Sequence, residues 1–292
     1  MQQYMNVRRR IVLASDLSGR CDRALDRAAL LASEWDAELV VVHAMDESEA
    51  VRDTRLTRNL PSWRQPEQHQ TAAEVWLRED LHAQGVAATV DVTSGNAHDV
   101  VLAATQHEGV ALLVTGIAHD DPLDRIQLGS TVDSLLKDVA VPMLTVRRRA
   151  RGPYRHVLVA TDFSSASGPA LATALAWFGN LRVTLFHAFY VNDADLDANP
   201  RALEAPQRLA TVQYQRFLAE SGLTPEATQK LNLVFEHGHT EALLRDFVHH
   251  EGVDLVILGT HGYGGFLRTL LGSTAQSLLH LLDCDTMIVR SQ

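Results

Sequence analysis

The segment Asp254-Leu-Val-Ile-Leu-Gly-Thr-His-Gly-Tyr-Gly-Gly-Phe-Leu-Arg-Thr-Leu-Leu-Gly-Ser273 joins an apolar run to a helical pattern. The run 254–259 predicts a buried strand and 273–282 predicts a helix, so a glycine-rich loop connects them. Glycines let backbone N–H groups approach a phosphate, and the first turn of a helix offers unpaired donors. Taken alone, the segment indicates either a phosphate-binding loop or an ordinary strand-to-helix turn.

The length and composition of the chain limit the classes of protein to which it can belong. The chain has 292 residues, 46% of them hydrophobic, 21% charged, and a formal net charge of −10. This predicts two globular domains and disfavours nucleic acid as a partner. The first residues lack the apolar core of a signal peptide, and no apolar run reaches membrane-spanning length. We therefore expect a cytoplasmic protein with no membrane partner, in which Cys21 and Cys284 are reduced thiols. Neither lysine lies in a Gly-Lys-Ser/Thr motif, which excludes a Walker-type site.

Apolar strand-length runs alternate with helical patterns along the first half of the chain. This alternation predicts a parallel sheet covered by helices on both faces. The expected strands are 11–14, 38–44, 86–93, 110–115 and 141–146. The expected helices are 18–33, 66–84, one after the turn at 95–99, and one from 130, with a surface connection at 46–62.

The second half repeats the first. Five landmarks match in order at an offset of 143 to 146 residues, among them His156–Asp162 against Arg10–Asp16 and Asp254–Gly259 against 111–116. This indicates a duplication. We predict two tandem doubly wound domains, 1–149 and 150–292, each a five-stranded parallel sheet. The charged run 147–155 is interpreted as a solvated linker.

An aspartate ends the first strand of each copy, Asp16 after Ser15 and Asp162 after Thr161. Ligands of open parallel sheets bind beyond the carboxyl ends of the strands, where an Asp can accept a hydrogen bond from an adenine amine or a ribose hydroxyl. The alternative role is capping of the next helix. For Asp16 both roles stay open, and for Asp162, whose domain has the full glycine loop, we favour the ligand.

The glycine loops of the two copies differ at one position. The C-terminal spacing is Gly259-x2-Gly262-x9-Gly272-Ser273, and the N-terminal one is Gly116-x2-His119-x9-Gly129-Ser130. A side chain at 119 obstructs a phosphate or disfavours a backbone angle that glycine allows, although a histidine can also donate a hydrogen bond. Asp120 and Asp121 add negative charge nearby. We expect the N-terminal site to be weakened or lost.

The duplicated unit, the strand-end Asp and the glycine spacing resemble the universal stress protein family in its tandem form, over essentially the whole chain. The resemblance implies an adenine-nucleotide-alpha-hydrolase-like fold, a role in the stress response, and ATP as the ligand, with or without Mg²⁺. Carried over by position, it implies these binding residues: Thr161, Asp162, Ala188 and Leu258 at the nucleoside, and Gly259, His261, Gly262, Gly272, Ser273 and Thr274 at the phosphates. It also implies dimerisation through the last strands, within one chain or between two chains.

Catalysis is not indicated by any motif. The sequence lacks a Gly-x-Ser-x-Gly elbow and a His-Glu-x-x-His motif. Arg268, inside the loop, is either a phosphate clamp or a solvent-facing side chain. The leading interpretation is a nucleotide-binding regulatory or protective module that acts on an unidentified protein partner. The alternatives are a slow ATP hydrolase and a scaffold that binds no nucleotide, and no catalytic or metal-binding residue is assigned.

Overall fold

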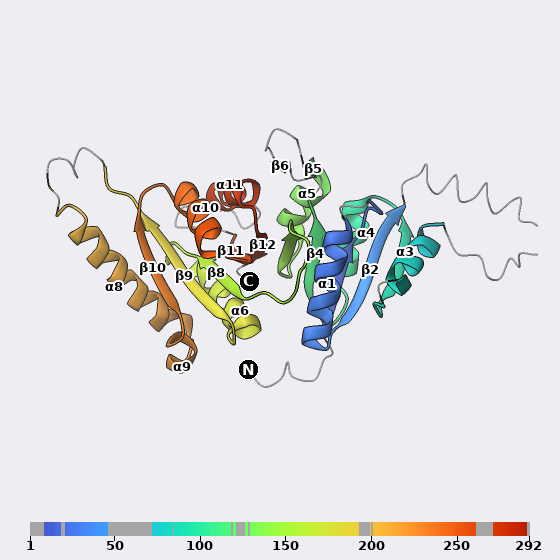
Figure 1. The fold of residues 1–292 in the computed structure, drawn as a ribbon, viewed down its shortest axis with the longest axis horizontal. Helices are drawn as coiled ribbons and strands as arrows, with labels where there is room; N and C mark the ends of the chain where they lie inside the picture. Colours follow the sequence, from blue (N-terminus) through green and yellow to red (C-terminus); the bar gives the residue numbers. More distant parts are fainter. Residues whose placement is uncertain are drawn as a thin grey trace, which may run out of the picture. The chain divides into compact units, whose positions relative to one another are not determined.

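The computed structural model describes residues 9–18, 21–45, 72–83, 85–117, 119–120, 126–127, 129–192, 199, 201–260 and 271–290. The chain divides into two compact units. The N-terminal unit comprises Met1–Asp120 and Leu128–Gly152, and the C-terminal unit comprises Asp121–Gln127 and Pro153–Gln292 (Figure 1). The predicted domain boundary between residues 149 and 150 stays a prediction.

The N-terminal unit contains a five-stranded parallel sheet in the order β3-β2-β1-β4-β7. Its strands are β1 (Arg10–Ala14), β2 (Glu38–Met45), β3 (Thr89–Ser94), β4 (Val110–Gly116) and β7 (Met143–Val146). Its helices are α1 (Cys21–Trp35), α3 (Ala72–Ala83), α4 (Ala97–Thr105) and α5 (Ser130–Asp138). Two short strands, β5 (His119–Asp120) and β6 (Ile126–Gln127), lie between β4 and α5 in the sequence.

The C-terminal unit contains the equivalent sheet in the order β10-β9-β8-β11-β12. Its strands are β8 (His156–Ala160), β9 (Arg182–Phe189), β10 (Asn232–His237), β11 (Leu255–Gly259) and β12 (Asp285–Val289). Its helices are η2 (Ser165–Ser167), α6 (Gly168–Phe178), α8 (Glu204–Ser221), α9 (Pro225–Thr228), α10 (Thr240–Glu251) and α11 (Ser273–Leu281).

The predicted fold class is confirmed. Each sheet is parallel, and its central strands are buried along nearly their whole length because helices cover both faces (Figure 1). In each unit the chain moves outward from the first strand through two neighbours and then returns to its other side. The order therefore reverses beside β1 and beside β8, which is the topological switch point of this architecture.

Element boundaries differ from the sequence expectation by a few residues. The first helix begins at Cys21 and not at 18, and the third strand begins at Thr89 and not at 86. The expected helix 66–84 is seen as α3, and its first residues lie outside the described part of the chain, as does the surface connection 46–62.

The charged run 147–155 is only partly solvated. Arg148, Arg149 and Arg151 are exposed, as the linker interpretation requires, but Arg147 and Tyr154 are buried. The Tyr154 hydroxyl donates a 2.7 Å hydrogen bond to the buried carboxylate of Asp285. The run is therefore anchored at both ends. A charge pattern alone did not predict this, because tertiary partners decide whether these side chains are buried.

Candidate functional site

The ends of β8 and β9 are joined by hydrogen bonds beside the switch point of the C-terminal unit. The Thr161 N–H donates to the Phe186 carbonyl on β9 at 3.0 Å, and the Thr161 carbonyl accepts from Nδ1 of His187 at 2.8 Å. A carbonyl only accepts, so Nδ1 of His187 carries the hydrogen. Burial, the main cause, lowers the pKa of His187, which keeps the ring neutral in this role. These bonds hold the end of β8 against β9.

Asp162 lies in a tight corner directly after β8. Its Oδ1 accepts the Ser164 N–H at 3.0 Å, while Oγ1 of Thr161 accepts the Phe163 N–H at 2.9 Å. Phe163, between them, has a left-handed backbone with φ of 61°. The residue at the N-cap of α6 is Ser167, so Asp162 shapes the corner and does not cap that helix. A bulky residue at positive φ is rare and typically marks a functional or closely packed turn.

The end of β11, where the glycine loop begins, lies against η2, which directly follows the corner. A Cβ placed on Gly259 would lie 2.7 Å from the Ala166 carbonyl oxygen and 3.3 Å from Cα of Ser167. Only glycine allows β11 to end this close to η2. Gly259 therefore has a packing role that the sequence did not reveal, and the end of β11 lies against η2, a few residues after Asp162.

The loop closes at the first turn of α11. The Gly272 N–H donates to the carbonyl of buried Thr260 at 2.8 Å, so both ends of the loop lie together. Gly272 is the N-cap of α11 and has no side chain to bond the first-turn N–H groups. Ser273 and Thr274 follow and are exposed. A helix start of this kind offers backbone donors and the positive end of its dipole to an anion.

The predicted binding residues divide into three groups. Thr161 and Asp162 form the corner, and Gly259 lies against η2, which follows it. Gly272 bonds Thr260 at the other end of the loop and is followed by Ser273 and Thr274. Ala188, half-buried, lies on β9 beyond His187, whereas the side chain of Leu258 is buried, with 3% of its surface exposed. His261, Gly262 and Arg268 lie outside the described residues. The role of each residue in binding stays a prediction.

An aromatic cluster under the corner was missed by sequence reasoning. The Phe163 ring packs with its centroid 4.4 Å from the His187 ring and 5.7 Å from Phe217 of α8. Tyr214 and Phe235 complete the cluster, with ring centroids 6.0 Å and 5.9 Å from Phe163. The phenylalanine after the strand-end Asp was the one available signal, but its partners are distant in the sequence. The cluster explains how the positive φ of Phe163 is sustained.

The N-terminal unit builds the same corner. Oδ1 of Asp16 accepts the Ser18 N–H at 2.9 Å, Leu17 has φ of 57°, and Nδ1 of His43 donates to the Ser15 carbonyl at 2.9 Å. Gly129 is the N-cap of α5, again without a side-chain bond. The two corners therefore share these hydrogen bonds and the left-handed residue. His119 stands where the C-terminal copy has Gly262. Its backbone lies in β5, and its side chain is not among those that the structure describes.

One contact differs between the corners. The Cys21 thiol donates to Oδ1 of Asp16 at 3.0 Å, whereas Ser167, the equivalent residue, bonds Oγ1 of Thr161 at 2.8 Å. Burial, with a smaller contribution from the Asp16 hydrogen bond, raises the pKa of Cys21 to about 12. The thiol is therefore protonated and unreactive at neutral pH, in agreement with the expectation of a reduced cysteine.

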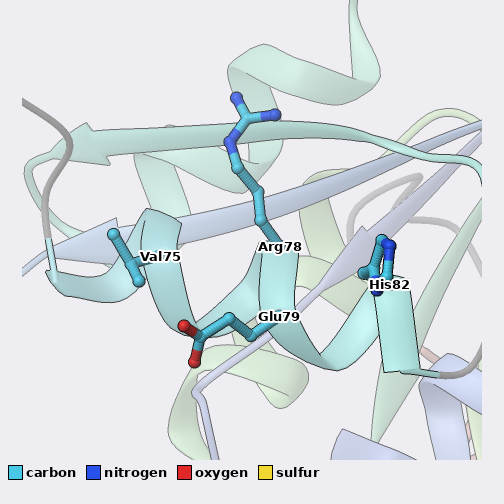
Figure 2. Close-up of a pocket in the computed structure, with 4 residues that line it drawn as sticks. All are labelled: Val75, Arg78, Glu79 and His82. Atoms are coloured by element: carbon cyan, nitrogen blue, oxygen red, sulfur yellow. The ribbon is translucent and has the colours of Figure 1, made fainter. Parts of the chain in front are cut away.

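A shallow depression elsewhere does not compete with this site. It has a volume of about 350 Å³ and is lined by Val75, Arg78, Glu79 and His82, all of α3. Figure 2 shows Arg78 and Glu79 pointing in different directions, so the lining groups do not converge. Within the described part of the chain, no group of three or more His, Cys, Asp or Glu side chains is arranged to hold a metal ion.

The chain is similar to known proteins of one family. The profile of the universal stress protein family matches residues 8–147 and 153–290. Universal stress protein A homolog 1 of Coxiella burnetii is 27% identical over 141 residues, covering 47% of this chain and 96% of that protein. Homolog 2 from the same organism is 37% identical over 70 residues, covering 22% of this chain and 47% of that one.

Solved structures extend the likeness to the whole chain. The crystal structure of a universal stress protein from Archaeoglobus fulgidus superimposes with a TM-score of 0.66 and 18% identity, covering 99% of each chain. At this identity the likeness shows the fold.

The fold and the corners define a tandem doubly wound α/β protein in which the strand order of each sheet reverses beside its first strand. The profile matches nearly all of both copies, so this chain belongs to the universal stress protein family, as its sequence pattern predicted. In the described residues, no helix is both long and apolar enough to cross a membrane.

Proposed function

We propose that the C-terminal unit binds ATP at the corner after β8 and the loop after β11, and that the protein acts as a regulatory or protective module in the stress response. The observation that carries this proposal is the contact of Gly259 with Ala166 and Ser167. It supports the proposal because it brings the end of β11, where the glycine loop begins, against η2, which closely follows the strand-end Asp162, although about a hundred residues separate them in the sequence.

The residues present suit an adenine nucleotide. Asp162 offers a carboxylate at the position expected for the nucleoside, and the uncapped start of α11 offers backbone N–H groups for the phosphates. Gly262 and His261 supply the remainder of the loop in this proposal. Mg²⁺ would be held mainly by phosphate oxygens, since the described residues do not gather a set of acidic ligands.

The N-terminal unit is proposed to be degenerate. Its corner matches that of the C-terminal unit, so the difference rests on His119 in place of Gly262. Bound ATP regulates a partner only if it binds two states of the protein unequally. We expect no more than weak hydrolysis, because the sequence contains no motif that supplies a catalytic base for water.

Gly262→His, which copies the N-terminal residue into the C-terminal loop, tests the assignment. We expect the variant to bind ATP at least about tenfold more weakly than the parent, since the side chain occupies phosphate space or forbids a glycine backbone angle. Isothermal titration with and without Mg²⁺ measures this. His119→Gly is the reciprocal variant, and circular dichroism controls for folding.

Equal affinity of the parent and Gly262→His would disprove the assignment to the C-terminal loop. Mass spectrometry of small molecules released from freshly purified protein identifies the resident ligand directly. Sustained phosphate release by the parent that is lost in Arg268→Ala would favour the hydrolase.

A further inference from the structure

Three aromatic side chains gather at the carboxyl edge of β9 and β10. The Tyr190 ring stacks on His237 with centroids 6.1 Å apart and an interplanar angle of 23°, and lies 5.1 Å from the His239 ring at 40°. Tyr190 follows β9, and the histidines end β10 and precede α10. We call Tyr190, His237 and His239 the aromatic platform.

The platform is held in place and yet is open to solvent. Nε2 of His237 donates to the Val191 carbonyl at 3.0 Å, which fixes the ring under Tyr190. Tyr190 is nevertheless 57% exposed, one of few large apolar side chains so exposed in the described residues. A fixed aromatic ring with an open face is the arrangement that binds another flat ring by stacking.

His239 is an unfavourable residue for its position in the helix. It is the N-cap of α10 and makes no side-chain capping bond. In the N-terminal unit the equivalent residue is Asn96, whose side chain caps α4 by accepting the His98 N–H at 2.9 Å. The C-terminal copy therefore has an aromatic ring at the position where the N-terminal copy has a stabilising cap. A residue that breaks a local rule without a structural gain indicates a functional position.

The duplication isolates the platform to one unit. The residues equivalent to Tyr190, His237 and His239 are Asp46, Ser94 and Asn96, none of them aromatic. The platform thus occurs in the unit that keeps the full glycine loop. The platform lies at the same strand end as Ala188, a residue that the family resemblance implies for the nucleoside: Phe189 pairs with His237, and Tyr190 lies two residues beyond Ala188.

We propose that the aromatic platform is a base-binding subsite, in which Tyr190 stacks on the purine ring of the nucleotide and His239 borders it. This deepens the proposed function and rests on it. The platform would select ligands that carry a flat base over bare polyphosphates, while the glycine loop supplies affinity for the phosphates.

Titration of ATP and of inorganic tripolyphosphate into the full chain tests the subsite. Loss of one base stack in Tyr190→Ala is expected to weaken ATP binding by about tenfold and to leave tripolyphosphate binding unchanged. Tyr190→Phe keeps the ring and should retain most of the affinity for ATP. Trp76→Ala removes an equally exposed aromatic side chain from α3 and is the matched control.

His239→Asn separates function from stability. It restores the cap found at Asn96, so the thermal midpoint should rise, while the affinity for ATP falls about threefold with the loss of one ring. A variant that is more stable and binds more weakly cannot be explained by damage to the fold.

Two results would overturn the subsite. One is Tyr190→Ala binding ATP within about twofold of the parent, a change smaller than the loss of one base stack. The other is a loss of tripolyphosphate as large as that of ATP. If Gly262→His binds neither ATP nor tripolyphosphate and Tyr190→Ala binds both like the parent, the proposed function is supported and the base-binding subsite is disproved. If the parent binds no ATP, both fall.

Discussion

Gly259 shows why a glycine in a nucleotide-type loop does not by itself identify a ligand contact. Its Cβ position is occupied by the Ala166 carbonyl, so packing of the protein alone requires glycine there. In the proposed function it is Gly262 that distinguishes the two copies, because the equivalent residue is His119. Gly272 has an ordinary helix-cap backbone, with φ of −59°, and its contribution is the lack of a side chain over the first turn of α11.

Gly259→Ala is expected to destabilise the protein by about 1 to 3 kcal/mol, since a methyl group would force the backbone of η2 or β11 to move. Urea unfolding measures the change in the free energy of unfolding. Gly168→Ala is the matched control because its Cβ meets nothing closer than Cε2 of Phe217 at 4.0 Å. Equal stability of the two variants would show that the close approach at Gly259 is not maintained in solution.

The first strand of the C-terminal unit is held at its two ends by histidines. At the far end from the crevice, Nδ1 of His156 donates to the Glu251 carbonyl at 3.2 Å, so Nε2 accepts the Thr184 hydroxyl at 2.8 Å. His156 thereby ties β8 to α10 and β9 in its neutral form. Burial, the main cause, lowers the pKa of His156, as it does for His187.

These buried histidines predict a loss of stability in mild acid. Because the folded-state pKa of His156 lies below its unfolded value of about 6.5, the unfolded chain binds more protons between these two values. The free energy of unfolding should therefore fall as the pH drops from 6.5 towards the folded pKa. His156→Gln keeps a donor and an acceptor but does not titrate, so its stability should depend less on pH between 7 and 5.

His98 provides a control of opposite sign. It lies between Asp99, at 3.0 Å, and Asp138, at 2.8 Å, and the Asp99 hydrogen bond is the main cause that raises the pKa of His98. Its stabilisation is present below pH 6.5 and is lost as the pH rises through the folded pKa. His98→Gln should therefore lower stability in mild acid and have little effect at pH 8. Identical pH profiles for both variants and the parent would contradict these assignments.

The whole molecule consists of two copies of one unit that differ at the carboxyl ends of their strands. Both keep the sheet order, the corner and the uncapped helix after the fourth strand of the sheet, so the fold was retained through the duplication. The differences include the glycine-loop residue at 119 and 262, the aromatic platform, and the contact of Cys21 with Asp16. Cytoplasmic location, a protein partner and dimerisation stay predictions from composition and family resemblance.

Hydrogen exchange with and without ATP tests whether ATP binds the C-terminal unit and not the N-terminal unit. At a ligand concentration a hundredfold above Kd, binding adds about 2.7 kcal/mol to the stability of the state that binds. We expect slower exchange in the C-terminal peptides, above all around 158–165, 186–190 and 271–276, and little change in 9–45. Equal protection of 12–18 and 158–165 would show that the N-terminal crevice binds as well.

The amino-acid sequence by itself determined the fold class and the repeat. Continuous apolar strands such as 255–258 and amphipathic helices such as Cys21–Trp35 are local signals of a covered parallel sheet, and the constant offset between copies reveals the duplication. The corner aspartates and the loop spacing were also found in this way. They could be recognised because each lies within a short stretch whose pattern carries the information.

Only the tertiary structure decided which distant residues meet. The packing of Gly259 on Ala166, the bond from Tyr154 to Asp285 and the platform of Tyr190 with His237 and His239 all depend on strand pairing and helix docking. No local propensity encodes such contacts. They depend on which elements pack together and on the free energy of burying each side chain. The sequence pattern thus predicts which strand ends carry the candidate site, and tertiary packing decides which side chains surround it.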